Sequence, residues 1–346
     1  MINMIQKHIM CYPKMQVQDV AKLLFQSEFG GGHMIADSGK SLKRIQEEYE
    51  KLNLEDVVCM SEVEPIGDGM CRIYLTCLSN GMKAEVLNEM FVQCANHRTG
   101  TVEGLEKKIE TFLEACRNGI FAYEAKEAET FFENWKKQGY PAMSHSDIYR
   151  ESYHPAYRVI EETYVKTYEV TQMIEKATRP LVVAIDGMSA SGKTTMGNLL
   201  HENYPESNLF HMDDFFLQPH QRTDERLAEV GGNVDYERFK SEIIDHLSDK
   251  DGLKYRSYNC GNQKLGEEIF VPWSPLAIIE GAYSHHPYFG DVYDLRIFCE
   301  IEKEEQEARI LKRNGAEMLK RFQNEWIPME NKYFETYKTK EKSGLQ

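Results

Sequence analysis

The sequence predicts an α/β domain in the C-terminal half of the chain, preceded by a mostly α-helical N-terminal half. Three observations lead to this prediction. Between residues 16 and 135, apolar side chains recur every three or four positions, which is the period of a half-buried helix. After Pro180, short apolar runs alternate with helical segments, which is typical of a parallel sheet covered by helices on both faces. The chain has 346 residues, which favours two hydrophobic cores over one.

The composition argues against some classes of binding partner and some cellular locations. The net charge of −15 argues against nucleic acid and against an anionic membrane surface. The eight cysteines form no C-x-x-C pair, which is typical of reduced thiols. The chain shows no secretory signal and no apolar run of about 18 residues. We therefore expect a soluble, cytoplasmic protein, and the sequence is compatible with a homo-oligomer.

In the N-terminal half, the apolar period predicts helices over residues 16–29, 38–52, 83–97 and 102–119. A longer helix is expected from Tyr157 to Arg179. It should end there because the residue before a proline is biased out of the helical region. The predicted division is a helical domain of unrecognised function at 1–155, a linker helix at 156–179 and an α/β domain at 180–346.

Two stretches of the N-terminal half have unusual residues. In "QSEFGGGHMI", three glycines before His33 could shape a loop that approaches a ligand closely. In "HSDIYRESYHPAYRVI", several residues could together bind a phosphate or carboxylate, or could hold the linker helix against the second domain. They are His145, Tyr149, Arg150, His154 and Arg158.

The strongest motif is "LVVAIDGMSASGKTTM", which contains G-x-x-x-x-G-K-T between a predicted strand and a predicted helix. This context indicates a P-loop, whose backbone amides and helix N-terminus bind the phosphates of a nucleotide. Lys193 should reach the β- and γ-phosphates, and the Thr194 hydroxyl should ligate Mg²⁺. The residues expected to hold ATP are Gly187, Ser189, Ala190, Ser191, Gly192, Lys193, Thr194 and Thr195.

Acids follow two of the other predicted strands. Asp213 and Asp214 come after "NLFHM", and Glu280 ends "LAIIE". Acids at the ends of strands beside a P-loop hold the metal and act on the nucleophile. We expect Asp213 to be the general base and to lie beside the metal, and Glu280 to lie near Mg²⁺, directly or through water. Asp214 either assists or is merely exposed.

The segments "MDDFF", "YRSYNC" and "IIEGAYS", with an arginine-bearing helix after them, resemble the uridine kinase family of P-loop kinases. The resemblance covers roughly residues 180–340. It implies that ATP, with Mg²⁺, phosphorylates a hydroxyl on a small molecule, with a nucleoside as the first candidate. It also implies that Asp213 takes the proton of the 5′-hydroxyl. The residues expected to contact the acceptor are Asp214, Phe216, Tyr258 and Tyr283, together with Arg222 in the segment after the paired acids.

The sequence departs from the family pattern at two places. Tyr258 is followed by Asn259 instead of aspartate, and the family's histidine is absent near residues 262 and 263. The lid segment "ARILKRNGAEMLKRF" is short. Arg309 and Arg313 share one helix face there, where they could clamp phosphate charge or pair with neighbouring acids. Another small alcohol, an NTP-hydrolysing switch and a nucleotide sensor therefore remain alternatives.

The segment after the paired acids, "QPHQRTDERLAEVGGNVDYERF", is expected to be a loop that covers the acceptor. It offers further candidate contacts at Arg226, Asp235 and Arg238. His285 and His286 in "SHHPYF" are adjacent and lack a third ligand, which favours a loop near the active site over a zinc site.

Overall fold

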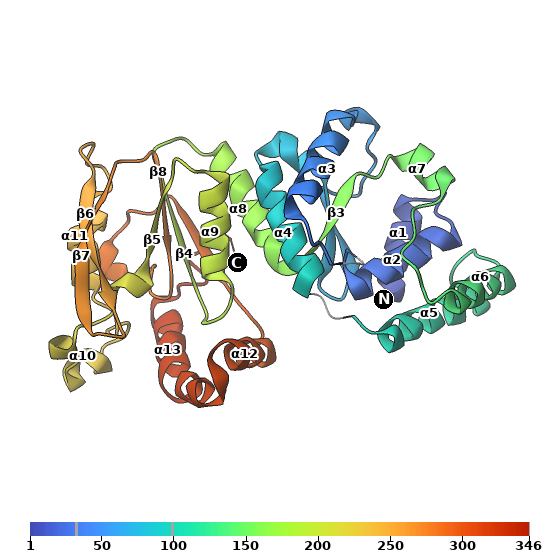
Figure 1. Cartoon of the computed structure of the whole chain (residues 1–346). Helices are drawn as coiled ribbons and strands as arrows, with labels where there is room; N and C mark the ends of the chain where they lie inside the picture. The colour runs from blue at the N-terminus through green and yellow to red at the C-terminus, as the bar shows by residue number, and fades with distance from the viewer. Residues whose placement is uncertain (32–33, 98–99, 346) are drawn as a thin grey trace. The chain divides into compact units, whose positions relative to one another are not determined.

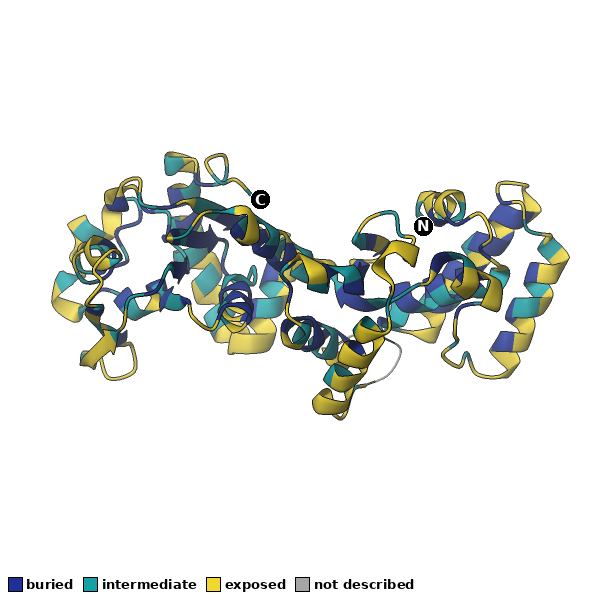
Figure 2. Ribbon diagram, turned by 90° about the horizontal axis from the view of Figure 1, so that it is seen from above, coloured by how far each residue is buried: buried dark blue, intermediate teal, exposed yellow. Residues whose placement is uncertain are grey.

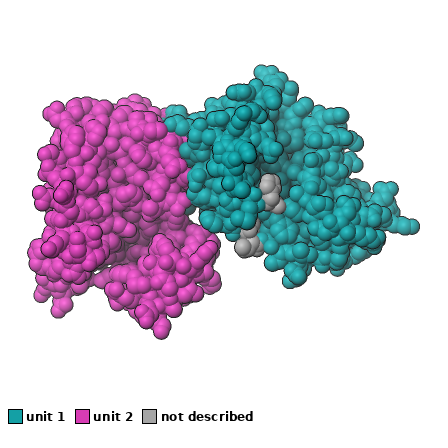
Figure 3. All heavy atoms as spheres, viewed as in Figure 1, with its two compact units in different colours: residues 1–175 teal, residues 176–346 magenta. Residues whose placement is uncertain are grey.

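The computed structural model describes residues 1–31, 34–97 and 100–345. The chain divides into two compact units, residues 1–175 and 176–346 (Figure 3). The predicted glycine loop before His33 includes residues outside the described ranges. Within those ranges, no helix is both long and apolar enough to cross a membrane.

Helices make up most of the N-terminal unit (Figure 1). The helices expected from the apolar period are confirmed as α2 to α5. Among the described residues, the α-helices that begin in this unit are α1 (Ile2–Cys11), α2 (Val17–Phe29), α3 (Ser38–Glu50), α4 (Ala84–His97), α5 (Val102–Arg117), α6 (Ala125–Lys137), α7 (Asp147–Tyr153) and α8 (Val165–Lys176). Several have side-chain caps. At the start of α5, for example, the Thr101 side chain accepts a hydrogen bond from the Gly104 amide.

The N-terminal unit also contains a sheet that the sequence did not predict. Strands β1 (Val63–Gly67), β2 (Met70–Tyr74) and β3 (Tyr157–Glu161) form an antiparallel sheet in the order β1-β2-β3. The long helix predicted from residue 157 is therefore wrong over its first part, and α8 begins only at residue 165. Residues 157–161 bury their central side chains by pairing with β2, and this tertiary pairing overrides a weak helical period.

The C-terminal unit is built on a four-stranded parallel sheet in the order β5-β8-β4-β9. The strands are β4 (Leu181–Gly187), β5 (Asn208–His211), β8 (Leu276–Glu280) and β9 (Leu295–Cys299). Strands β4 and β8 are buried over almost their whole length. Figure 2 colours the buried residues of the chain dark blue. Strands β6 (Leu253–Asn259) and β7 (Lys264–Val271) form a separate antiparallel pair.

Helices cover both faces of the parallel sheet. Helix α9 (Lys193–Asn203) packs against β4, β5 and β8. On the other face, Phe210 and Ile279 of the sheet share a hydrophobic core with Phe239 of α11 (Tyr236–Glu242) and Tyr333 of α13 (Ile327–Tyr337). The remaining helices are α10 (Asp224–Ala228) and α12 (Lys303–Arg321). The predicted three-layer α/β fold is confirmed.

The strand order determines where a ligand site can form. Because β4, β5 and β8 are parallel neighbours, their carboxyl ends lie at one edge of the sheet. Glu280 at the end of β8 is in register with Ile185 of β4 and with His211 of β5. In open α/β sheets, ligands bind at this edge.

Candidate active site

The glycine-rich loop joins β4 to α9. Gly187 and Gly192 have φ angles of +138° and +95°, and Gly192 comes directly before the first turn of α9. A Cβ atom on Gly187 would lie 2.1 Å from the carbonyl oxygen of Cys299 on β9, so a larger residue does not fit there. The loop therefore wraps the N-terminus of a helix, where free amides attract anions.

The first two side chains of α9 have separate partners. Lys193 folds back over the loop, and its Nζ donates to the carbonyl oxygens of Gly187 and Met188, both at 2.8 Å. Thr194 Oγ1 donates to Oε2 of Glu280 at 3.1 Å. Since Glu280 ends β8, this bond joins the loop to the neighbouring strand.

Glu280 is 3% exposed and also contacts a histidine that the sequence analysis missed. His211, the last residue of β5, lies with Nδ1 at 2.5 Å from Oε1 of Glu280. The hydrogen bond with Glu280 raises the pKa of His211 above its ordinary value. The sequence did contain a signal for His211, because it is a polar residue at the end of an apolar run. The two acids that follow drew attention away from it.

The adjacent acids after β5 have different surroundings. Asp214 accepts a hydrogen bond from Ser257 Oγ at 2.6 Å, so β6 holds its side chain. Asp213 is exposed to solvent. Removal of water by nearby protein atoms, and then the negative charge of Glu280, raise the pKa of Asp213, while the charge of Lys193 opposes this. Asp213 therefore lies within range of the charges of both Glu280 and Lys193.

The donors at this edge fit a magnesium ion. The hydroxyl of Thr194 and the carboxylates of Glu280 and Asp213 are hard oxygen ligands, and the charge of Glu280 raises the pKa of Asp213. A divalent cation would neutralise both carboxylates. In the described part of the chain, no three acidic, histidine or cysteine side chains form a metal cage. The residues present thus fit a metal that takes most of its ligands from phosphates and water, as Mg²⁺ does.

The residues predicted to contact the acceptor do not all share one surface. Arg222 and Tyr258 come together, with Nη2 of the arginine 3.3 Å from the tyrosine hydroxyl. Phe216 is half-buried. Tyr283 is only 2% exposed, and its ring packs edge-on against Tyr333. Tyr283 therefore belongs to the hydrophobic core of the C-terminal unit, whereas Arg222 is exposed.

The polar residues of the segment after the acids mainly hold that segment together. Arg226 forms an ion pair with Glu237, with the closest atoms 2.5 Å apart. Asp235 is buried and caps α11 by accepting from the amide of Arg238. Arg238 donates to the main-chain carbonyl of Asp214 at 2.9 Å. Arg226, Asp235 and Arg238 therefore serve the fold of this segment, which is partly helical and not the open loop expected.

The two arginines of the predicted lid separate in the structure. Arg309 on α12 donates through Nη1 to the carbonyl of Ala190 at 3.2 Å, and it also pairs with Glu305. Arg313 is exposed and bonds to Asn314. Of the two, Arg309 lies at the glycine-rich loop.

Asp186, which the sequence analysis missed, joins the segments that pack beside the glycine-rich loop. Its fully buried carboxylate accepts from the amides of Tyr283 and His285 at 3.1 and 2.9 Å, and from the Tyr333 hydroxyl at 2.8 Å. An acid at the end of an apolar strand was the available signal. These bonds tie β4 to the segment after β8, so His285 belongs to a loop near the site, as expected.

Glu330 and Gln306 were also missed, and both touch one residue of the loop. Glu330 on α13 accepts from the amide and the hydroxyl of Ser189, at 2.9 and 2.6 Å. Gln306 on α12 donates to the Ser189 carbonyl at 2.9 Å. Nothing in the local sequence marks either residue, because their partners lie more than a hundred positions away.

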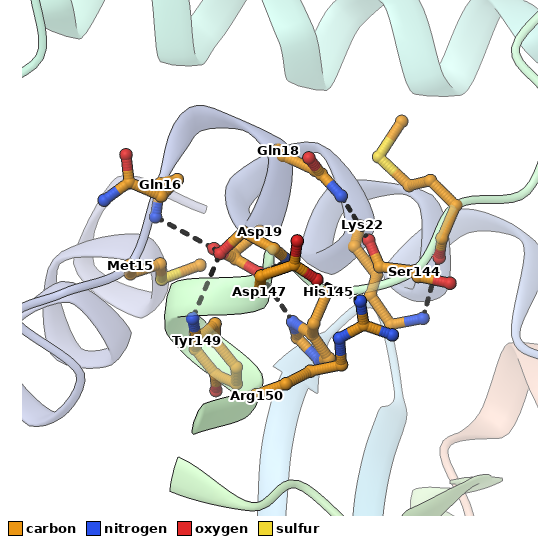
Figure 4. A network of polar contacts seen from close by, with 12 residues as sticks. Met15, Gln16, Gln18, Asp19, Lys22, Ser144, His145, Asp147, Tyr149 and Arg150 are labelled. Atoms are coloured by element: carbon orange, nitrogen blue, oxygen red, sulfur yellow. Dashed lines mark hydrogen bonds and ion pairs between the residues drawn. The ribbon is translucent and has the colours of Figure 1, made fainter. Parts of the chain in front are cut away.

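The polar cluster of the N-terminal unit does not converge on one point. His145 is buried, with Nδ1 2.8 Å from Oδ1 of Asp19 (Figure 4). Arg150 is exposed, and Arg158 forms an ion pair with Glu48 at 2.7 Å. These separate partners favour a structural role over a shared anion site.

Known proteins resemble part of this chain. It is 28% identical over 118 residues to uridine-cytidine kinase C of Dictyostelium discoideum, and 26% identical over 105 residues to nicotinamide riboside kinase of Schizosaccharomyces pombe. The chain is similar to these two kinases over part of its length only. The matches cover 34% and 28% of this chain, and 26% and 44% of the two relatives, so the chain spans less than half the length of either.

Two solved structures also resemble part of the chain. A possible uridine kinase from Bacillus stearothermophilus is 20% identical with a TM-score of 0.41, and the match covers 53% of this chain and 98% of that one. A putative fructose transport system kinase from Silicibacter sp. TM1040 is 20% identical with a TM-score of 0.41, over 49% of this chain and 94% of that one. No protein-family profile matches the sequence.

Proposed function

We propose that the protein transfers the terminal phosphoryl group of ATP to a hydroxyl of a small molecule, and that the acceptor is a nucleoside. One observation supports this most directly. The loop residues Lys193 and Thr194, the metal-fitting Glu280 and the solvent-facing Asp213 meet at one edge of the parallel sheet. An anion cradle, a metal position and a candidate base are the parts that phosphoryl transfer to an alcohol requires.

Each part has a defined task in this proposal. The amides of the loop bind the phosphates, and Lys193 exchanges its two loop carbonyls for phosphate oxygens. Thr194, Glu280 and Asp213 would hold Mg²⁺, which when bound neutralises charge on the phosphates. Asp213 accepts the proton of the acceptor hydroxyl. Its raised pKa suits this, since a general base works best with a pKa nearer the working pH.

The choice of a nucleoside rests on the relatives and on one pair of residues. Both named relatives are kinases of ribosides by name. Arg222 contacts Tyr258, the residue at which the family resemblance expects a contact with the acceptor. The missing histidine near residues 262 and 263 leaves the base of the nucleoside open.

The test is release of ADP from ATP and Mg²⁺ against a panel of nucleosides, sugars, vitamins and small polyols. Asp213→Asn should lower acceptor-dependent turnover by roughly 10²- to 10⁴-fold, the usual contribution of a general base. Asp224→Asn changes an exposed acid on α10 and should leave turnover unchanged. ATP hydrolysis that no acceptor stimulates would favour an NTP-hydrolysing switch, and ATP binding without any turnover would favour a nucleotide sensor.

A further inference from the structure

Helix α13 brings a buried carboxylate to the glycine-rich loop. Glu330 is 6% exposed. Its Oε2 accepts from the Ser189 amide at 2.9 Å, and its Oε1 accepts from the Ser189 hydroxyl at 2.6 Å. Both oxygens of one acid are thus used on one residue of a loop whose amides bind phosphates.

The position of Lys193 shows which end of the loop Glu330 occupies. The Lys193 ammonium rests on the carbonyls of Gly187 and Met188, directly before Ser189. Burial raises the pKa of the Glu330 carboxyl, and the charge of Lys193 opposes this, so the two side chains act on each other. The lysine of such a loop reaches the β- and γ-phosphates. Glu330 therefore lies at the end of the loop that meets the terminal phosphate.

We propose that Glu330 competes with the terminal phosphate for the Ser189 amide and thereby sets the affinity for the nucleoside triphosphate. This inference rests on the proposed function, since it requires that the loop binds ATP. A single N–H group donates well to one acceptor at a time. An ionised carboxylate beside a phosphate also repels it, and the repulsion is strong where water is scarce. ATP must therefore displace Glu330 or bind against its charge.

The loop keeps a second anchor when Glu330 withdraws. Gln306 on α12 holds the Ser189 carbonyl at 2.9 Å, and Arg309 on the same helix holds the Ala190 carbonyl at 3.2 Å. These bonds use carbonyl oxygens and leave the amides to anions. Removing the charge of Glu330 should therefore weaken its hold on the Ser189 amide, in favour of phosphate, without loosening the loop.

The experiment measures binding of ATP and of ADP to the full chain by calorimetry, with no acceptor present. Glu330→Gln keeps the shape and removes the charge, and Glu335→Gln is the matched control, an exposed glutamate on the same helix. We expect Glu330→Gln to bind ATP at least about tenfold more tightly than the wild type, which corresponds to 1.4 kcal/mol. The affinity for ADP, which lacks the terminal phosphate, should rise less. Glu335→Gln should bind both nucleotides with the affinity of the wild type.

Unchanged or weaker binding of ATP by a folded Glu330→Gln variant would overturn this inference and leave the proposed function intact. An equal gain for ATP and ADP would overturn the assignment to the terminal phosphate. If Glu330→Gln does not fold, Glu330→Met supplies a second uncharged side chain of similar length for the same comparison. Failure of the wild type to bind ATP at all would refute the proposed function, and this inference with it.

Discussion

Replacing Asp19 with asparagine should destabilise the N-terminal unit by about 2–4 kcal/mol, because buried donors would lose their acceptor. The Asp19 carboxylate is fully buried and accepts four hydrogen bonds. Its partners Gln16 and His145 are labelled in Figure 4. Oδ1 accepts from His145 Nδ1 at 2.8 Å and from the Ser146 amide at 2.9 Å. Oδ2 accepts from the Gln16 amide at 2.9 Å and from the Ser146 hydroxyl at 2.7 Å.

The magnitude follows from what an amide cannot do in this position. Whichever way asparagine is oriented, its NH₂ group meets at least one main-chain N–H, from Gln16 or from Ser146. An unsatisfied buried donor costs about 1–3 kcal/mol, and the loss of charge weakens the remaining bonds by a further 1 kcal/mol or so. The sum gives the expected range.

Chemical unfolding of the full chain, with amide hydrogen exchange at residues 16–19 and 145–149, measures the effect. Asp147→Asn is the control, because the Asp147 side chain is 83% exposed and pairs with Arg150 at the surface. That change should cost less than about 0.5 kcal/mol. A loss for Asp19→Asn no larger than the control's would refute the reasoning.

The same network makes a prediction about pH. Burial alone would raise the pKa of Asp19, but hydrogen bonds from His145, Gln16 and Ser146 hold it below its ordinary value of 3.8. The contribution of Asp19 to the free energy of unfolding is therefore fully present above pH 3.8 and is lost as the pH falls further. The difference in stability between the wild type and Asp19→Asn should shrink as the pH falls below 3.8.

Two further predictions concern a buried imidazole and a close backbone contact. Burial lowers the pKa of His145 from 6.5 to about 3. The contribution of His145 to the free energy of unfolding is therefore complete above pH 6.5. Below pH 6.5 it falls by up to about 1.4 kcal/mol per pH unit. His145→Gln should flatten the fall in melting temperature between pH 6.5 and 5, and an unchanged slope would exclude His145 as its source. Gly187→Ala should cost more than about 3 kcal/mol, because the new Cβ would lie 2.1 Å from the Cys299 carbonyl oxygen. Gly290→Ala, at φ +74° with open space around it, should cost about 1 kcal/mol, and equal losses in thermal unfolding would contradict the steric argument.

The parts that could be predicted from the sequence depend on spacing along the chain. The loop needs glycines at 187 and 192 with a lysine beside the second, and a strand and a helix around them, so one short window specifies it. Glu280 could be placed for a similar reason. A buried parallel strand is a short apolar run, and the residue that ends it lies at the ligand edge.

The parts that could not be predicted depend on residues distant in the sequence. Tyr157–Glu161 becomes a strand because β2 offers a partner, and no local period reports that partner. Glu330 meets Ser189 only because α13 packs beside the loop. The choice between Asp213 and Asp214 likewise needed the position of Ser257 on β6.

The order of strands in the N-terminal sheet has a consequence for synthesis on the ribosome. The buried central strand β2 is complete at residue 74, but its second partner β3 begins only at residue 157. At roughly 5–20 residues per second, this edge of β2 waits about 4–17 s for its partner. A nascent chain therefore carries an unpaired, largely apolar strand edge during that interval, the kind of surface that recruits other strands. Chaperone binding to the emerging chain should be greatest in this window, and slowing translation between residues 75 and 156 should lower the yield of folded protein.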